Sequence, residues 1–305
     1  MKPGRSGVLV VDKEGGVTSF QVVSRLKRAL GARKIGHGGT LDPSATGVLP
    51  ILLGEATKLS PYLMDHDKEY VTTIRLGVST DTQDLTGAVL GTAPVPPLSR
   101  ADIERACAAL TGVIAQVPPM YSAVHHEGRR LYELARAGRE VERAARAIVV
   151  RSITVEAVAL PRLTLRIVCG KGTYVRSLAA DLGAKLGVGG AVERLIRTRV
   201  GPFRLEDAVP GPLAQEGHAA TLWDWVLPPD AALAGYPEVA LDEAATDALL
   251  HGRSVGAAGA AAGSVVRVYG AGRRFLGIGR VLSGGRVKPE RILHADHPGT
   301  PVSPA

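Results

Sequence analysis

Aromatic residues are scarce in this chain. Only 4% of its 305 residues are Phe, Trp or Tyr, so its core must be built mainly from aliphatic side chains. The same scarcity leaves few side chains on which nucleic-acid bases could stack. Apolar residues still make up 45% of the chain, which is enough for a sizeable core. The length allows one large domain, or a medium domain with a smaller one.

Cysteine is rare as well. The chain has two, Cys107 and Cys169, and neither belongs to a CxxC pair. Cys107 falls on the apolar side of a helical pattern and Cys169 ends an alternating strand pattern, so we expect two small buried hydrophobic residues. This spacing supports neither a zinc site nor a redox motif.

Signals for membranes, nucleotides and metals are also missing. The opening residues, MKPGRSGVLVV, contain no signal-peptide core, and no apolar run reaches transmembrane length. We therefore expect a cytoplasmic protein without membrane contact. No Gly-Lys-Ser/Thr follows the Gly-rich segment, which excludes a P-loop. Residues 81–84 suggest a calcium loop, but no Glu occupies its twelfth position. No metal or cofactor is predicted.

Positive charge is in excess and unevenly spread. The formal net charge is +8. Residues 1–40 hold eight Lys/Arg against two acidic residues, and residues 171–204 hold seven against two. Such clusters favour a surface that faces phosphates, and hence a polyanionic partner. The ordinary alternative is a solvated basic face with no ligand.

Strand and helix patterns are interspersed along the chain. Strand patterns cover residues 8–11, 68–76 and 148–169, the last broken at Pro161. Helical patterns cover residues 18–30, 99–110 and 131–137, and another follows Thr173, a candidate N-cap. Because turn-linked strand pairs replace a regular βαβ repeat, we predict an α+β fold with a mixed, largely antiparallel sheet flanked by helices.

Composition also divides the chain. Residues 209–217 read as a connection, and beyond Pro237 a small β-rich unit begins, with strand patterns at 265–269 and 275–282. We predict a large domain over residues 1–236 and a small domain over 237–294. The Pro-rich residues 295–305 are predicted to be a disordered tail.

The Gly-rich loop, GHGGTLDPSATG at residues 36–47, is the most informative stretch. Dense glycine allows the backbone to come close to a ligand. Pro43 favours an extended conformation for Asp42. An aspartate held in this way, in basic surroundings, stays ionised and can act as nucleophile or base. The ordinary alternative is a turn aspartate that hydrogen-bonds its own loop.

From Gly36 onward, GHGGTLDPSATGVLPILLGEATKL resembles the signature of the TruB family of pseudouridine synthases. Further blocks follow in the family order: KEY with LGVSTDTQDLTG, QVPPMYSA with GRRLYELARAG, KGTYVRSL, and Leu195 with RTRVGPF. The resemblance covers residues 8–208 and implies the pseudouridine synthase fold. The stretch from LLHGRSV to PERIL is similar to a PUA domain, an RNA-binding module.

The resemblance implies three catalytic residues. Asp42 would be the catalytic aspartate, Tyr70 would pack on the flipped uracil and assist proton transfer at C5, and Arg176 would pair with Asp42. The residues themselves leave other readings open, because a tyrosine on a strand is ordinarily a core residue. Arg176, however, falls in the first turn of a helix and opposes its dipole, so an acidic partner is expected.

The resemblance also implies substrate contacts. Leu195 would line the uracil pocket, His37 would fill the place that the base leaves, and Tyr174 and Lys171 would bind substrate. One departure is His125-His126, where the family usually has Lys. Histidine is mostly neutral at pH 7, so an RNA contact there would be weaker or pH-dependent.

The reaction that the family implies is the isomerisation of uridine 55 in the T arm of elongator tRNAs. The base must be flipped out of folded RNA, and no cofactor or metal is needed. An insertion at about residues 125–150 would close over the T loop, and the PUA-like domain would contact the acceptor end. We expect a monomer that needs no guide RNA, because the long N-terminal extension and basic tail of dyskerin-like enzymes are missing. A role in tRNA folding, with or without catalysis, stays open.

Overall fold

The computed structural model describes residues 5–216, 219–256 and 259–294. Its main feature is a mixed sheet in the order β1-β3-β12-β4-β11-β10-β7, with β2 beside β3 and β13 beside β12. Every pairing in this sheet is antiparallel except that of β3 with β12. The predicted largely antiparallel α+β fold is therefore confirmed. The strands are β1 (Gly7–Lys13), β2 (Ile35–His37), β3 (Thr46–Leu53), β4 (Lys68–Leu76), β7 (Gly112–Gln116), β10 (Arg146–Ala159), β11 (Arg162–Cys169), β12 (Gly190–Val200) and β13 (Phe203–Arg204).

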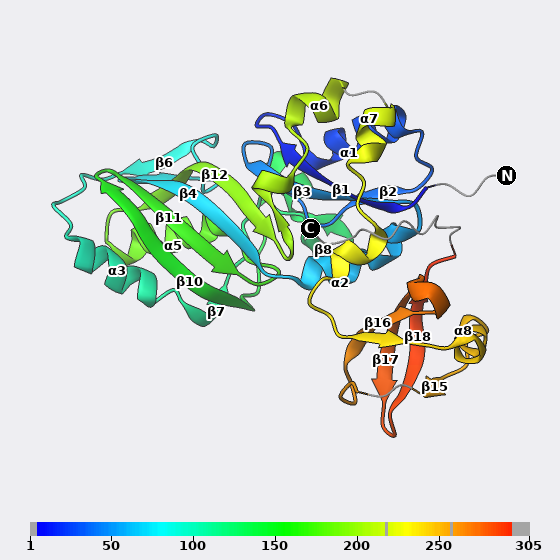
Figure 1. Ribbon diagram of the computed structural model, residues 1–305. Helices are drawn as coiled ribbons and strands as arrows, with labels where there is room; N and C mark the ends of the chain where they lie inside the picture. Colours follow the sequence, from blue (N-terminus) through cyan, green and yellow to red (C-terminus); the bar gives the residue numbers. More distant parts are fainter. Residues whose placement is uncertain (1–4, 217–218, 257–258, 295–305) are drawn as a thin grey trace.

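This sheet has a short half, formed by β1, β2 and β3, and a long half, formed by β12, β13, β4, β11, β10 and β7. The two halves meet at a narrow contact. The parallel pairing of β3 with β12 consists of Ile196 with Thr46 and Arg197 with Gly47. At Gly47, where φ is 101°, a Cβ atom would lie 2.3 Å from the Arg197 carbonyl oxygen, so only glycine fits there. The Gly-rich loop enters β3 at this junction, which places it where the two halves join (Figure 1).

Helices cover both halves of the sheet. Helix α1 (Ser19–Leu30) begins with the predicted capping box of Thr18 and Gln21 and ends at Gly31 in the left-handed conformation. The long half of the sheet packs against α3 (Arg100–Ala108) and α5 (Val175–Lys185). Cys107 on α3 and Cys169 on β11 are both buried, as predicted.

The prediction that residues 209–217 form only a connection was wrong. Residues 209–217 contain a short helix, α6 (Gly211–Glu216), which packs with α7 (Ala219–Asp224) on α1. Burial of Ala214 in the core outweighs the local Gly-Pro signal, and Pro212 is tolerated in a first turn.

Thr173 is not the N-cap of α5, because the helix begins at Val175 and Tyr174 occupies the capping position without a side-chain cap. The Gln116 side chain fixes this start instead. It accepts a hydrogen bond from the Tyr174 amide at 2.8 Å and donates one to the Tyr174 carbonyl at 3.1 Å.

The small C-terminal unit is a five-stranded sheet in the order β14-β16-β17-β18-β15, accompanied by α8 (Glu243–Leu250). Its curled strands confirm the predicted PUA-like architecture, and β16 and β17 have the bounds predicted from the sequence. The predicted disordered tail, 295–305, lies outside the described residues. The strands are β14 (Glu238–Ala240), β15 (Val255–Gly256), β16 (Val265–Tyr269), β17 (Phe275–Leu282) and β18 (Arg286–Ile292).

The small unit shares a hydrophobic core with the large one. Phe275 and Tyr269 belong to the same buried cluster as Leu52, Leu59 and Leu63 of the large domain. Figure 1 shows the small sheet below α2 (Ser60–Asp65), on the side of the molecule away from β10 and β11. The two units are thus packed together rather than joined by a free linker.

This shared core predicts that a chain ending at Tyr236 loses stability. Removal of the small unit would expose the apolar face that now contacts Tyr269, Phe275, Ile278 and Leu293. We expect a loss of about 3–5 kcal/mol and a fall in Tm of roughly 10 °C. Thermal unfolding of this chain, beside a control that ends at His294, measures the effect. An unchanged Tm would mean that the shared core contributes no stability.

Candidate active site

The Gly-rich loop between β2 and β3 presents Asp42. Its backbone is fixed by Ser19, whose hydroxyl accepts a hydrogen bond from the Leu41 amide at 2.9 Å and donates one to the Leu41 carbonyl at 3.1 Å. The Gly38 amide donates to the Pro50 carbonyl at 2.8 Å. The loop is shorter than the sequence suggested, because residues 35–37 and 46–47 are in strands. Asp42 therefore sits in a turn that is tied down just before it.

Arg176 and Asp42 form a two-pronged ion pair. Nε of Arg176 donates to Oδ2 of Asp42 at 2.8 Å, and Nη2 donates to Oδ1 at 3.1 Å. The guanidinium also donates to the carbonyls of Thr82 and Tyr121, each at 2.8 Å. The Arg176 side chain is 5% exposed, whereas that of Asp42 is 34% exposed. The buried partner orients the carboxylate and leaves it accessible to a substrate.

Tyr70 and Leu195 lie on neighbouring strands, β4 and β12, and both are buried. Leu195 is opposite Thr72 in the strand pairing, and Arg197 is opposite Tyr70. Side chains two residues apart share a face of a sheet, so Tyr70, Leu195 and Arg197 share one. Burial raises the pKa of Tyr70, so its hydroxyl stays protonated at neutral pH and can donate or accept a hydrogen bond.

His37 ends strand β2, beside the loop. Its Nδ1 accepts a hydrogen bond from the Gly39 amide at 3.4 Å. Burial, assisted by the charge of Arg197, lowers the pKa of His37, so the imidazole is neutral at pH 7. Tyr174 is held through its backbone by Gln116, and burial raises the pKa of its phenol.

Lys171 takes no part in these contacts. Its side chain is exposed, and its ammonium forms an ion pair with Asp65 at the end of α2, with an N···O distance of 2.5 Å. The structure thus brings Asp42 and Arg176 into contact, and places His37 beside the same loop, but gives Lys171 a separate partner on the surface.

The predicted insertion at 125–150 forms a small unit of its own. Strands β8 (His125–His126) and β9 (Arg129–Arg130) make a hairpin that leads into α4 (Leu131–Arg136). Met120, Leu131 and Leu134 form a separate apolar cluster. Strand β10 already begins at Arg146, inside the predicted range. The hairpin residues Arg129 and Arg130 are exposed.

Two buried cations, Lys13 and Arg197, were not predicted from the sequence. They are the largest fully buried side chains of the described residues, and each is 1% exposed. The Lys13 ammonium donates to the carbonyls of Glu14, Val17 and Pro43 at 2.7, 2.8 and 3.2 Å. Burial lowers the pKa of Lys13 to about 8. A signal was present in the sequence, because Lys13 ends an apolar run and Arg197 alternates with Leu195 on one strand.

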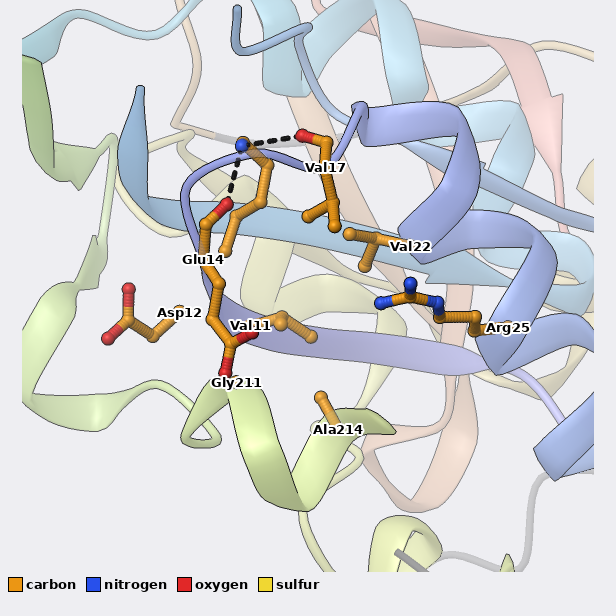
Figure 2. Close-up of a pocket in the computed structure, with 9 residues that line it drawn as sticks. Val11, Asp12, Glu14, Val17, Val22, Arg25, Gly211 and Ala214 are labelled. Carbon is orange, nitrogen blue, oxygen red and sulfur yellow. Dashed lines mark hydrogen bonds between the residues drawn. The ribbon is translucent and has the colours of Figure 1, made fainter. Parts of the chain in front are cut away.

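Figure 2 shows the first two of these Lys13 hydrogen bonds, to Glu14 and Val17, at the wall of a pocket between β1, α1 and α6. The pocket measures about 10 Å³, enough for no more than one water molecule. A larger open hollow of about 700 Å³ beside Leu76, Val78 and Leu85 contains none of the predicted site residues. The first pocket is therefore too small for a base, and the second lies apart from the predicted site residues.

Across residues 5–216, 219–256 and 259–294, no group of three or more His, Cys, Asp and Glu side chains is arranged to hold a metal ion. No helix in the same ranges is long and apolar enough to cross a membrane.

Solved structures with the same fold define the class of protein. One is "Crystal Structure of a Cbf5-Nop10-Gar1 Complex", with a TM-score of 0.73 and 27% identity over 94% of this chain and 84% of that chain. Another is "Structure of H/ACA RNP bound to a substrate RNA containing 2'-deoxyuridine", with a TM-score of 0.71 and 26% identity over the same shares. The architecture is that of the pseudouridine synthase fold. Within it, Asp42 of the Gly-rich loop is paired with Arg176 of α5.

Family models and relatives narrow the class. "TruB family pseudouridylate synthase (N terminal domain)" matches residues 27–175, "tRNA pseudouridylate synthase B C-terminal domain" matches 176–234, and "Pseudouridine synthase II TruB, C-terminal" matches 237–293. The chain belongs to the TruB family and is a pseudouridine synthase.

Three relatives illustrate the similarity, and each is described as "tRNA pseudouridine synthase B". That of Aromatoleum aromaticum is 48% identical over 94% of this chain and 92% of its own length. That of Chromohalobacter salexigens is 44% identical over 94% of both. That of Pseudomonas aeruginosa is 42% identical over 95% of this chain and 96% of its own.

Proposed function

We propose that this enzyme converts uridine 55 in the T arm of elongator tRNAs to pseudouridine, with Asp42 as the reacting carboxylate. The observation that carries the proposal is the ion pair of Asp42 with Arg176, in which a buried guanidinium holds an accessible carboxylate. Full-length similarity to relatives described as tRNA pseudouridine synthase B supports tRNA as the substrate.

The reaction moves the glycosidic bond within one nucleotide. The N1–C1′ bond breaks, the base turns, and a C5–C1′ bond forms. C5 loses its proton to solvent and N1 gains one, so no atom other than hydrogen is exchanged. In this proposal Asp42 acts as nucleophile or base, and Arg176 keeps it ionised and oriented.

The remaining residues receive supporting roles. Tyr70 packs on the flipped uracil and assists proton transfer at C5 as a relay, giving up its own phenol proton as it accepts the one from C5. Leu195 provides an apolar wall, and neutral His37 occupies the position from which the base departs. Tyr174 contacts the substrate near the start of α5. Lys171, exposed and paired with Asp65, is proposed as a phosphate contact at the rim.

Two units are proposed to bind the body of the tRNA. The hairpin and helix at residues 125–145, with exposed Arg129 and Arg130, would close over the T loop. The PUA-like domain, residues 237–294, would contact the acceptor end. We therefore expect a chain that ends at Tyr236 to bind tRNA more weakly, in addition to being less stable.

The enzyme is proposed to act alone, as a monomer without guide RNA. The solved structures of similar fold include complexes of Cbf5 with other proteins, but their identity to this chain is only 25–27%. Relatives that match the full length at 42–48% are described by a tRNA substrate. Purified chain and a tRNA transcript should therefore suffice for turnover.

The site of modification is tested by mapping pseudouridine in total tRNA from cells that lack this protein. We expect position 55 to lose pseudouridine and to regain it when the wild-type chain, but not Asp42→Asn, is supplied. Loss at another position would contradict the proposed target. If Asp42→Asn instead corrects growth or tRNA-folding defects of these cells, the protein has a role in tRNA folding that is separate from catalysis.

A further inference from the structure

Arg197 is an unusual residue to find at the centre of a sheet. It lies on β12, at the parallel contact with Gly47 where the two halves of the sheet join. Its side chain is 1% exposed. Arginine is almost never fully buried unless it is paired, because the loss of hydration is costly. In the described part of the chain Arg197 forms no ion pair, which makes its position costly unless the guanidinium has a task.

Its guanidinium donates to three backbone carbonyls, and Arg197 also forms a side-chain hydrogen bond with Tyr70. Nε donates to the carbonyl of Val48 at 2.8 Å, Nη2 to that of Gly39 at 3.0 Å and Nη1 to that of Thr40 at 3.3 Å. Gly39 and Thr40 come shortly before Asp42, and Val48 follows on β3. The planar guanidinium thus connects the loop residues that precede Asp42 with strand β3, which follows it.

Other contacts hold the part of the loop that Arg197 does not reach. Ser19 holds Leu41, and Lys13 donates to the Pro43 carbonyl. The backbone on both sides of Asp42 is therefore fixed by side chains from three different elements, β1, α1 and β12. Of these, only Arg197 also faces another predicted catalytic residue.

That residue is Tyr70. Arg197 is opposite Tyr70 in the pairing of β12 with β4, and its positive charge opposes the rise in the pKa of Tyr70 that burial causes. The same charge contributes to the lowered pKa of His37. Arg197 is therefore close to the Asp42 loop with its neighbour His37, and to Tyr70, which come from two separate parts of the chain.

We propose that Arg197 is a positioning residue that sets the Asp42 loop relative to Tyr70, so that carboxylate and phenol meet the same flipped uracil. The inference rests on the proposed roles of Asp42 and Tyr70. Lysine keeps the charge at this position, but its single ammonium lacks the fork that joins Gly39, Thr40 and Val48. A displacement of about 1 Å at a reacting group can cost roughly 100-fold in rate.

The experiment compares Arg197→Lys and Arg197→Met with Arg162→Lys as matched control. Arg162 is on β11 of the same sheet, exposed and paired with Glu193. For each full-length protein we would measure thermal unfolding, the Kd for the tRNA transcript, and the single-turnover rate of pseudouridine formation. In the same assay the wild type defines full activity, and Asp42→Asn defines the residual rate without the carboxylate.

We expect Arg197→Lys to remain folded, to bind tRNA within about threefold of wild type and to react roughly 100-fold more slowly. Arg197→Met should be slower still, and Arg162→Lys should match wild type. An unchanged rate for Arg197→Lys would overturn the proposal, as would a loss of affinity at constant rate. Failure of both Arg197 variants to fold would make Arg197 a purely structural residue and also overturn it. An inactive wild type would instead refute the proposed function.

Discussion

Replacement of Asp42 by Asn is expected to abolish pseudouridine formation, a fall of roughly 10⁴-fold or more, and to leave tRNA affinity within about tenfold of wild type. The amide keeps the shape of the carboxylate and can still accept a hydrogen bond from Arg176. It lacks the charge that nucleophilic or base chemistry requires. Single-turnover assays and equilibrium binding to the same transcript measure the two quantities separately.

A suitable control is Asp181→Asn, because Asp181 is a half-buried carboxylate on the same helix as Arg176 and belongs to no part of the proposed site. This variant should react like wild type. Turnover near the wild-type rate in Asp42→Asn would exclude Asp42 as the reacting group. A large loss of affinity with little loss of rate would make Asp42 a binding residue.

Replacement of Arg176 by Ala should have the second-largest effect. The variant leaves Asp42 without its partner and leaves the carbonyls of Thr82 and Tyr121 without their donor. We expect turnover to fall by roughly 10²–10³-fold and the free energy of unfolding to fall by about 2–3 kcal/mol. This loss in the free energy of unfolding is small for a broken buried ion pair, because water reaches the partly exposed Asp42 carboxylate.

The double variant, with Asp42→Asn and Arg176→Ala, tests whether the two residues act as a unit. If they do, its rate should be no lower than that of Asp42→Asn alone. Independent, multiplying losses would mean that Arg176 has a task apart from Asp42. A weaker Kd with an unchanged rate in Arg176→Ala would make Arg176 a phosphate contact.

Local patterns in the sequence predicted much of the fold. The capping box at Thr18, the alternation along β4 and the strand break at Pro161 each depend on a few neighbouring residues, and the structure confirms them. Helix α6 was missed because its stability comes from packing on α1, which outweighs a local Gly-Pro signal. The start of α5 was misplaced because Gln116, far away in sequence, fixes it.

In the candidate site, too, features that depend on neighbouring residues were predicted and those that depend on distant contacts were not. The expected acidic partner of Arg176 followed from its place in a first helical turn, and the structure supplies Asp42. Arg197 was missed because its importance depends on the contact between β3 and β12, which no local pattern contains. Lys171 was included through its motif alone, and the structure pairs it with Asp65.

The most direct test of the proposed function follows tritium placed at C5 of uridine 55 in a full-length tRNA transcript. Formation of the C5–C1′ bond requires that C5 lose its hydrogen, so the purified chain alone should release one tritium to water per turnover. The modified RNA should keep its mass in unlabelled material. A transcript with cytidine at position 55, labelled at the same carbon, should release none. Equal release from that cytidine, or tight binding of the uridine transcript without any release, would contradict the account.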